Sequence, residues 1–277
     1  YGDDVVCTYV NTKVPAKAYL FVLKLTDPQD ATATFDFTAT GPDLDEAFAL
    51  AGGDYTGFEV DPGFGGQTYT VTEADKAGWK LIELDCVVST DPATIVPGDL
   101  DTGEVSVDLL EGEVAVCVYE NQKLGTLTVD KVTDVQSTFV FPFEATGVTP
   151  TQFDLTGGGA PQVFEDIPVG TEVSITEDVP TAAPDRWSLS SIECIGSATP
   201  AQIVGATATV QIGAGEDVGC TFKDAQVPSA TVQIVKAADP ADGTQFDFLA
   251  EGADGGVMPS DYSFSLTPDG GPADRTF

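Results

Sequence analysis

The stretch LFVLKLTDP at residues 20–28 decides the fold, because related stretches recur twice further along the chain. LTVDKVTD occupies residues 127–134 and VQIVKAADP occupies residues 232–240. This places Lys24, Lys131 and Lys236 in register, 107 and then 105 residues apart. Self-similarity at a fixed period is the signature of a tandem array of domains. The chain is therefore predicted to consist of repeats of about 105 residues.

Other parts of the repeat follow in the same order. TYTVTE (68–73) matches EVSITE (172–177), GWKLIELDC (78–86) matches RWSLSSIEC (186–194), and VCVYEN (116–121) matches GCTFKD (219–224). VVCTYVN (5–11) matches only the last of these elements. We therefore expect the last strand of a preceding repeat at 1–17, complete repeats at 18–124 and 125–226, and the first half of a following repeat at 227–277. The short connections predict a semi-rigid rod. The partial ends fit either a window on a longer array, which we favour, or a first strand that completes the last domain of the next subunit.

The composition favours strands over helices. Apolar and polar residues alternate in short runs rich in Thr, Val and aromatic residues, and the chain has 29 Gly, 18 Pro and one Met. Such alternation is typical of half-buried strands. The sequence therefore predicts an all-β protein of tandem β-sandwich repeats.

The charge balance excludes several classes of function. Asp and Glu number 45 against 11 Lys and Arg, with no His, so the formal net charge is -34. Nucleic-acid binding needs clustered cations, and Ser-His-Asp hydrolysis needs histidine. The chain contains no run of 18 or more apolar residues, so no membrane-spanning helix is expected. No combination of nucleophile, base and oxyanion-binding groups is evident, so a turnover enzyme is not expected. No cofactor is expected either, although acidic turns such as GDLDTG offer oxygen ligands for calcium as well as ordinary turn chemistry.

The five cysteines follow the repeat. Each complete repeat has one pair at equivalent positions, Cys86 with Cys117 and Cys194 with Cys220, whereas Cys7 would pair outside this chain. The spacing is not CxxC, which makes zinc improbable and leaves disulfides or free buried thiols. Disulfides are the better interpretation and imply an oxidising, extracytoplasmic setting. Trp79 and Trp187, each seven residues before a Cys, are expected to pack in the core over these disulfides.

A lysine, a glutamate and an amide or acid recur on strands where the apolar side chains point inward. The alternation places Lys24, Glu73 and Asn121 on inward positions of the first repeat. Burial lowers the pKa of a lysine and raises that of a carboxyl. A neutral amine beside an Asn or Asp carbonyl, with a protonated Glu to shuttle protons, is an arrangement for forming an intramolecular amide. Asparagine occurs only at Asn11 and Asn121, and the second repeat has Asp224 at that position.

At these residues the chain resembles the Cna-B, or SpaA-type, domains of bacterial pilins and adhesin stalks, which have an Ig-like, prealbumin-like fold. The resemblance rests on the first-strand Lys, the TVTE-type strand followed by GW or RW, and the terminal Asn or Asp, and through the repeat it covers the whole chain. It departs from the simplest pilin pattern in the disulfides, and there is no LPxTG-type signal to support assembly by sortase. Carried over by position, it implies isopeptide bonds Lys24–Asn121 assisted by Glu73 and Lys131–Asp224 assisted by Glu177, with Asn11 and Lys236 belonging to incomplete repeats.

Two functions remain open at this point. The resemblance implies the shaft of an extracellular filament, pilus or adhesin stalk, whose partners are neighbouring copies or repeats. The alternative is a surface adhesin or carbohydrate-binding module that itself binds a ligand, with calcium in acidic loops and with residues 43–57 and 148–160 as variable loops. For the polar clusters, the alternative to a covalent bond is a salt-bridged core pair.

Overall fold

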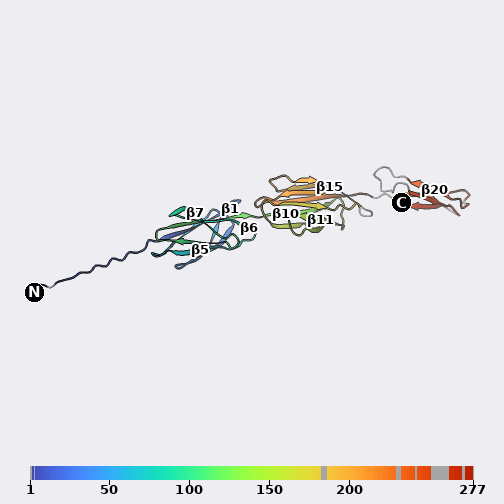
Figure 1. Ribbon diagram of the computed structural model, residues 1–277. Helices are drawn as coiled ribbons and strands as arrows, with labels where there is room; N and C mark the ends of the chain where they lie inside the picture. The colour runs from blue at the N-terminus through green and yellow to red at the C-terminus, as the bar shows by residue number, and fades with distance from the viewer. Residues whose placement is uncertain are drawn as a thin grey trace. The chain divides into compact units, whose positions relative to one another are not determined.

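The computed structural model describes residues 2, 4–181, 186–228, 232–240, 242–250, 262–269 and 272–276. All of the regular secondary structure in these residues is strand, which confirms the all-β class. No helix among them is long and apolar enough to cross a membrane. Figure 1 colours the strands along the chain, from β1 in blue to β22 in red.

The first complete domain is a sandwich of two sheets. One sheet has the strand order β4-β1-β9-β6-β7 and the other has the order β3-β2-β5-β8. Its strands are β1 (Ala18–Asp27), β2 (Thr34–Gly41), β3 (Leu44–Ala51), β4 (Tyr55–Val60), β5 (Gln67–Glu73), β6 (Trp79–Val88), β7 (Asp91–Pro97), β8 (Glu104–Leu109) and β9 (Val114–Lys123).

The second complete domain repeats this plan with one strand moved. Its sheets have the orders β13-β10-β18-β15 and β12-β11-β14-β17-β16, so the additional edge strand joins the other sheet. Leu124 alone separates β9 from the first strand of this domain. The strands are β10 (Gly125–Thr133), β11 (Val140–Thr146), β12 (Gln152–Thr156), β13 (Gln162–Ile167), β14 (Glu172–Glu177), β15 (Trp187–Ile195), β16 (Gln202–Val204), β17 (Thr207–Gln211) and β18 (Asp217–Gln226).

In each domain the first strand runs parallel to the last. In the first domain β1 pairs with β9, with Lys24 beside Tyr119 and Thr26 beside Asn121. In the second, β10 pairs with β18 in the same way, with Lys131 beside Phe222. Alternate residues of these strands are buried between the sheets, as the period of two requires. The inward side chains of the first and last strands therefore lie next to each other in the core.

The residues after 226 form the beginning of a third repeat. β19 (Gln233–Lys236) pairs with β22 (Ala273–Thr276), as β1 pairs with β4. β20 (Phe246–Ala250) pairs with β21 (Tyr262–Leu266), as β2 pairs with β3. By their contacts, residues 227–277 form the body of a unit separate from the two complete domains.

Two sequence-based expectations about local structure are wrong. Residues 4–17 carry no strand and are almost entirely exposed, because their counterparts β9 and β18 are central strands and these residues have neither neighbour to pair with. Residues 43–57 and 148–160, which the ligand-binding alternative treats as variable loops, contain β3, the start of β4, and β12. Strand β3 pairs with β2 along its whole length, so the cross-strand ladder overrides the acidic, Ala-rich composition of LDEAFALA.

Candidate functional site

Lys24 lies in the core of the first domain. It follows Ala18, Leu20 and Val22 on the inward face of β1, and all four residues are fully buried. Asn121 occupies the inward position of β9 two residues beyond the register partner of Lys24, and is 3% exposed. Glu73 is the last residue of β5 in the facing sheet, which brings a carboxyl across the sandwich to the same place.

The three side chains form one connected cluster. The Lys24 Nζ donates to Asn121 Oδ1 at 2.7 Å, and the Asn121 Nδ2 donates to Glu73 Oε1 at 2.6 Å. The other Glu73 oxygen, Oε2, lies 3.4 Å from the Lys24 Nζ. The ammonium also donates to the backbone carbonyls of Tyr119 at 3.1 Å and Leu25 at 2.9 Å. Glu73 thus bridges the amine nitrogen and the amide nitrogen with its two oxygens.

Burial shifts this pair toward its uncharged forms. Desolvation lowers the pKa of Lys24 to about 8, against the opposing attraction of Glu73. Desolvation also raises the pKa of Glu73, although Lys24 and the Asn121 amide pull it the other way. A neutral amine and a protonated carboxyl are therefore more accessible here than they would be in water.

The second domain brings the equivalent residues together. The Lys131 Nζ lies 2.6 Å from Glu177 Oε1 and 2.8 Å from Asp224 Oδ1. All three residues are at most 3% exposed. Desolvation raises the pKa of Glu177 to about 7, with the like charge of Asp224 adding to the shift and Lys131 opposing it. This cluster has two carboxyls for one ammonium, so its net charge is zero only when one of the carboxyls is protonated.

An aromatic ring lies against each lysine. The Lys24 Nζ is 4.3 Å from the centroid of Phe35, and the Lys131 Nζ is 4.3 Å from that of Phe141. In the partial third repeat the Lys236 Nζ is 4.0 Å from the ring of Phe246. Strand alternation alone does not reveal this role, although the recurring FDF and FPF triplets that carry these rings are a usable signal.

The tryptophans pack at the lysine end of the core, and the expectation that they cover the disulfides is wrong. Trp79 packs edge-on against Phe35 at 5.3 Å between ring centroids, and Trp187 packs likewise against Phe141 at 5.2 Å. Trp79 is opposite Lys123 on β9, whereas Cys86 is opposite Cys117. Seven residues of extended strand place the two ends roughly 20 Å apart.

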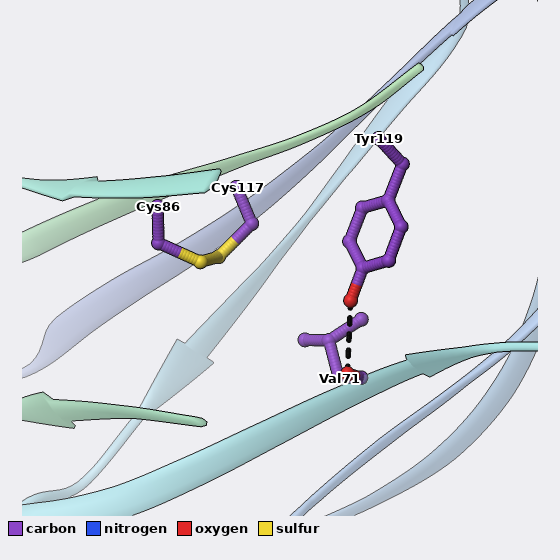
Figure 2. The surroundings of a disulfide bond; sticks show 4 residues. All are labelled: Val71, Cys86, Cys117 and Tyr119. Carbon is purple, nitrogen blue, oxygen red and sulfur yellow. Dashed lines mark hydrogen bonds between the residues drawn. A yellow bond between two sulfur atoms is a disulfide. The ribbon is translucent and has the colours of Figure 1, made fainter. Parts of the chain in front are cut away.

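Both cysteine pairs form disulfides between neighbouring strands. Cys86 and Cys117 are directly opposite each other on β6 and β9 with 4.0 Å between Cα atoms, and Cys194 and Cys220 on β15 and β18 are 4.1 Å apart. Figure 2 shows the first disulfide beside Tyr119, whose hydroxyl donates to the Val71 carbonyl at 2.8 Å across the sandwich. The inward row of β9 therefore carries a disulfide cysteine, a tyrosine that ties the two sheets, and then Asn121.

The residues of the incomplete repeats lie apart from such clusters. Cys7 is a free, exposed thiol, and Asn11 is exposed. The Lys236 Nζ donates to the carbonyl of Ala237 at 2.6 Å. Within the described parts of the chain, no three acidic, cysteine or histidine side chains are grouped so that they could hold a metal ion.

Comparison with known proteins agrees with this domain plan. The SpaA family of prealbumin-like fold domains matches residues 22–123 and, a second time, residues 127–226. The chain belongs to the family of SpaA-type prealbumin-like fold domains. No curated protein matches the sequence.

Solved structures with similar chains include three from bacteria. The TIE protein of Bacillus anthracis is 15% identical with a TM-score of 0.37, over 95% of this chain and 43% of that one, so this chain spans less than half of its length. An adhesin of Mobiluncus mulieris, described as containing intramolecular disulfide, isopeptide and ester bond cross-links, is 11% identical with a TM-score of 0.36, over 70% of this chain and 99% of its own. The major pilin of Streptococcus pyogenes is 16% identical with a TM-score of 0.30, over 78% and 99%.

Proposed function

We propose that these SpaA-type domains form part of the shaft of an extracellular filament, pilus or adhesin stalk, and that an isopeptide bond joins the first and last strands of each complete domain. The observation that carries the proposal is the contact between the Lys24 amine and the Asn121 amide, with Glu73 touching both. A salt-bridged core pair needs only the lysine and the glutamate. The third group, an amide on the last strand held by both partners, is what amide formation requires.

The arrangement suits a proton-balanced reaction. The neutral Lys24 amine attacks the Cγ atom of Asn121, and the bond from Cγ to Nδ2 breaks. Glu73 gives a proton to the departing nitrogen through Oε1, the oxygen that Nδ2 already contacts, and recovers one from the Lys24 nitrogen through Oε2. One ammonia leaves and Glu73 ends as it began. In the second domain Lys131 attacks Asp224, with Glu177 in the same role, and one water leaves.

The bond would carry tension past most of the domain. Lys24 lies near the end of β1, and Asn121 lies two residues before the end of β9. Force entering at Ala18 would pass along β1, cross to Asn121 and leave through Leu124 toward β10. The strands between Lys24 and Asn121 would bear none of it. Two disulfides and an oxidising, cell-surface location fit the same proposal.

Single-molecule stretching of the whole chain tests this function. The native chain should show no unfolding step from either complete domain. A Glu73→Gln chain should show one new step of about 230 Å, since 97 residues separate Lys24 from Asn121 and the disulfide withholds 31 of them. Reduction should lengthen that step to about 340 Å. A native chain that unfolds domain by domain would defeat the proposal, and glycan binding lost on calcium chelation would favour the ligand-binding alternative.

A further inference from the structure

The outer surface of the β4-β1-β9-β6-β7 sheet is apolar, although the opposite face of the same sheet already forms the core. Phe21, Leu23 and Leu25 point outward from β1, since Leu20, Val22 and Lys24 between them are buried inward. A side chain built on Gly57 of β4 would collide with the Phe21 ring at 2.4 Å, so that ring lies over the neighbouring strand on the outside. We call this surface the apolar face, and its residues are Tyr19, Phe21, Leu23, Leu25, Tyr55, Val87, Ile95, Pro97, Val114, Val116 and Val118.

These side chains form continuous rows across the sheet. Phe21 is paired with Val116, which is paired with Val87, which is paired with Ile95. The next row along the strands joins Tyr55, Leu23 and Val118 and continues through Asp85 to Pro97. Several members are widely exposed, with Tyr55 at 72%, Ile95 at 57% and Val116 at 39%. From strand spacing and rise, the apolar face covers roughly 400 Å², which is in the range of the largest patches on soluble proteins and is often functional.

The other sheet of the same domain shows what an ordinary solvated face looks like in this chain. Its outward positions carry Thr38 on β2, Thr70 and Thr72 on β5, and Ser106 on β8. Thr70 and Ser106 share a hydrogen bond of 2.8 Å across the strands. One sheet of a sandwich therefore has a polar outer surface and the other does not, which is the pattern expected when one face is covered by a partner.

The second domain supplies a further comparison at matched positions. Alignment on the lysines and cysteines places Thr128 where the first domain has Phe21, and Thr221 where it has Val118. Asp130 stands in place of Leu23, and Gly219 in place of Val116. Exposed Val163 and Ile195 flank these positions, so the second domain keeps apolar residues at the sides of the row and lacks them at its centre. An apolar centre is thus a property of the first domain and is not required by the fold.

The charges around the apolar face are acidic at both ends of the strands. Glu59 lies next to Tyr19 at one end and accepts its hydroxyl at 3.1 Å, and the ion pair of Lys17 with Asp61 lies just beyond it. Glu83 and Glu120 lie at the other end on β6 and β9, with Lys80 one row further out, and Asp85 lies one row nearer, between Val118 and Pro97. We propose that the apolar face is a docking surface for a protein partner whose contacting surface is apolar and bordered by lysine or arginine.

A second copy of this chain fits the surface poorly. A two-fold axis along the strands would place the Glu83 and Glu120 end over itself. A two-fold axis across the strands would place that end over Glu59 of the other copy. Both arrangements oppose carboxylates in a chain of net charge -34, and like charges across an interface oppose association. An anionic lipid surface is disfavoured for the same reason.

The probe for this proposal is a disulfide-cyclised β-hairpin with one valine and isoleucine face bordered by four lysines, and its partner probe has glutamates in place of the lysines. Binding to the whole chain is measured by fluorescence anisotropy at physiological salt. The informative variant is Phe21→Thr with Val118→Thr, which introduces the residues that the second domain has at these positions. The matched control is Thr38→Ala with Thr70→Ala on the other sheet. Tyr55→Ser, at an exposed margin, serves as a variant that leaves the core untouched.

We expect the lysine hairpin to bind the native chain and the control variant equally, and to bind Phe21→Thr with Val118→Thr at least about tenfold more weakly, with Tyr55→Ser intermediate. The glutamate hairpin should not bind. Equal binding of the lysine hairpin to all variants would show simple attraction to an acidic chain and would overturn the proposal. Equal binding of the two hairpins would also overturn it. So would self-association of the chain in sedimentation, or binding of the chain to phosphatidylcholine vesicles, if Phe21→Thr with Val118→Thr abolishes it.

Discussion

Replacing Glu73 with Gln should separate the cross-link from the fold that surrounds it. Gln is close to Glu in size and keeps an oxygen that can accept from the Asn121 Nδ2, so the contact of 2.6 Å can persist. It cannot take a proton from Lys24 and return one to the leaving nitrogen. The first domain should therefore fold without forming the amide, while the second domain, which uses Glu177, forms its own.

The size of the effect follows from the loop that the bond closes. A cross-link between residues 97 apart removes chain entropy worth about 4 to 5 kcal/mol from the unfolded state. The existing disulfide, which closes 31 residues within that loop, lowers the expected gain somewhat. Leaving the Lys24 ammonium buried without a carboxylate adds a further cost of a few kcal/mol. The variant should thus lose at least about 4 kcal/mol of unfolding free energy in its first domain alone.

Guanidinium unfolding of the whole chain, followed by tryptophan fluorescence and intact mass, measures this loss. Two transitions are expected, and only that of the first domain should move. Glu120→Gln is the matched control, because Glu120 lies on the outward side of β9 next to Asn121, and this change should alter neither the loss of ammonia nor the unfolding midpoint. A Glu73→Gln chain that still loses ammonia, or whose first domain unfolds within about 1 kcal/mol of the native chain, would refute the reasoning.

Two further predictions concern the proton balance and the disulfides. In chain refolded from an unreacted, denatured state, the rate of cross-linking of the second domain should fall by about tenfold per pH unit above pH 7, because Glu177 must be protonated to shuttle a proton and its pKa is about 7. The rate of cross-linking of the first domain should stay constant up to about pH 8, the pKa of Lys24, and fall only above it. The reason is that the reactive state, a neutral amine with a protonated Glu73, contains the same number of protons as the ion pair, so the balance between the two does not depend on pH. Identical pH profiles by time-resolved mass would count against this scheme. Peptide mapping without reduction should find Cys86 linked to Cys117 and Cys194 linked to Cys220, and a link between the two pairs would contradict the fold. Replacing Cys194 and Cys220 with Ala should lower the unfolding free energy of the second domain by up to about 3.5 kcal/mol.

The repeat made much of the architecture predictable from the sequence. Because strand alternation has a period of two, the inward position of Lys24, Glu73 and Asn121 follows from the buried residues beside each of them. The family and the all-β class follow from the same residues. What alternation cannot give is the pairing of strands, which depends on contacts distant in sequence.

The errors arose from that limit. Trp79 was placed near Cys86 because the two are close in sequence, yet an extended strand carries them to opposite ends of the sandwich. Residues 43–57 differ between the repeats, which favours a variable loop, yet pairing with β2 makes much of the segment a strand. The apolar face was also missed, because a strand that is apolar on both faces, as in LFVLKL, has no alternation to interpret.

The most direct test of the proposed cross-links is the intact mass of the reduced, unfolded chain. An amide between Lys24 and Asn121 expels ammonia and one between Lys131 and Asp224 expels water, so the mass should fall below that of the sequence by about 17 and about 18 Da. Fragmentation should locate the first loss between Lys24 and Asn121 and the second between Lys131 and Asp224. A reduced mass equal to that of the unmodified sequence would contradict the account and leave two buried, non-covalent clusters in its place.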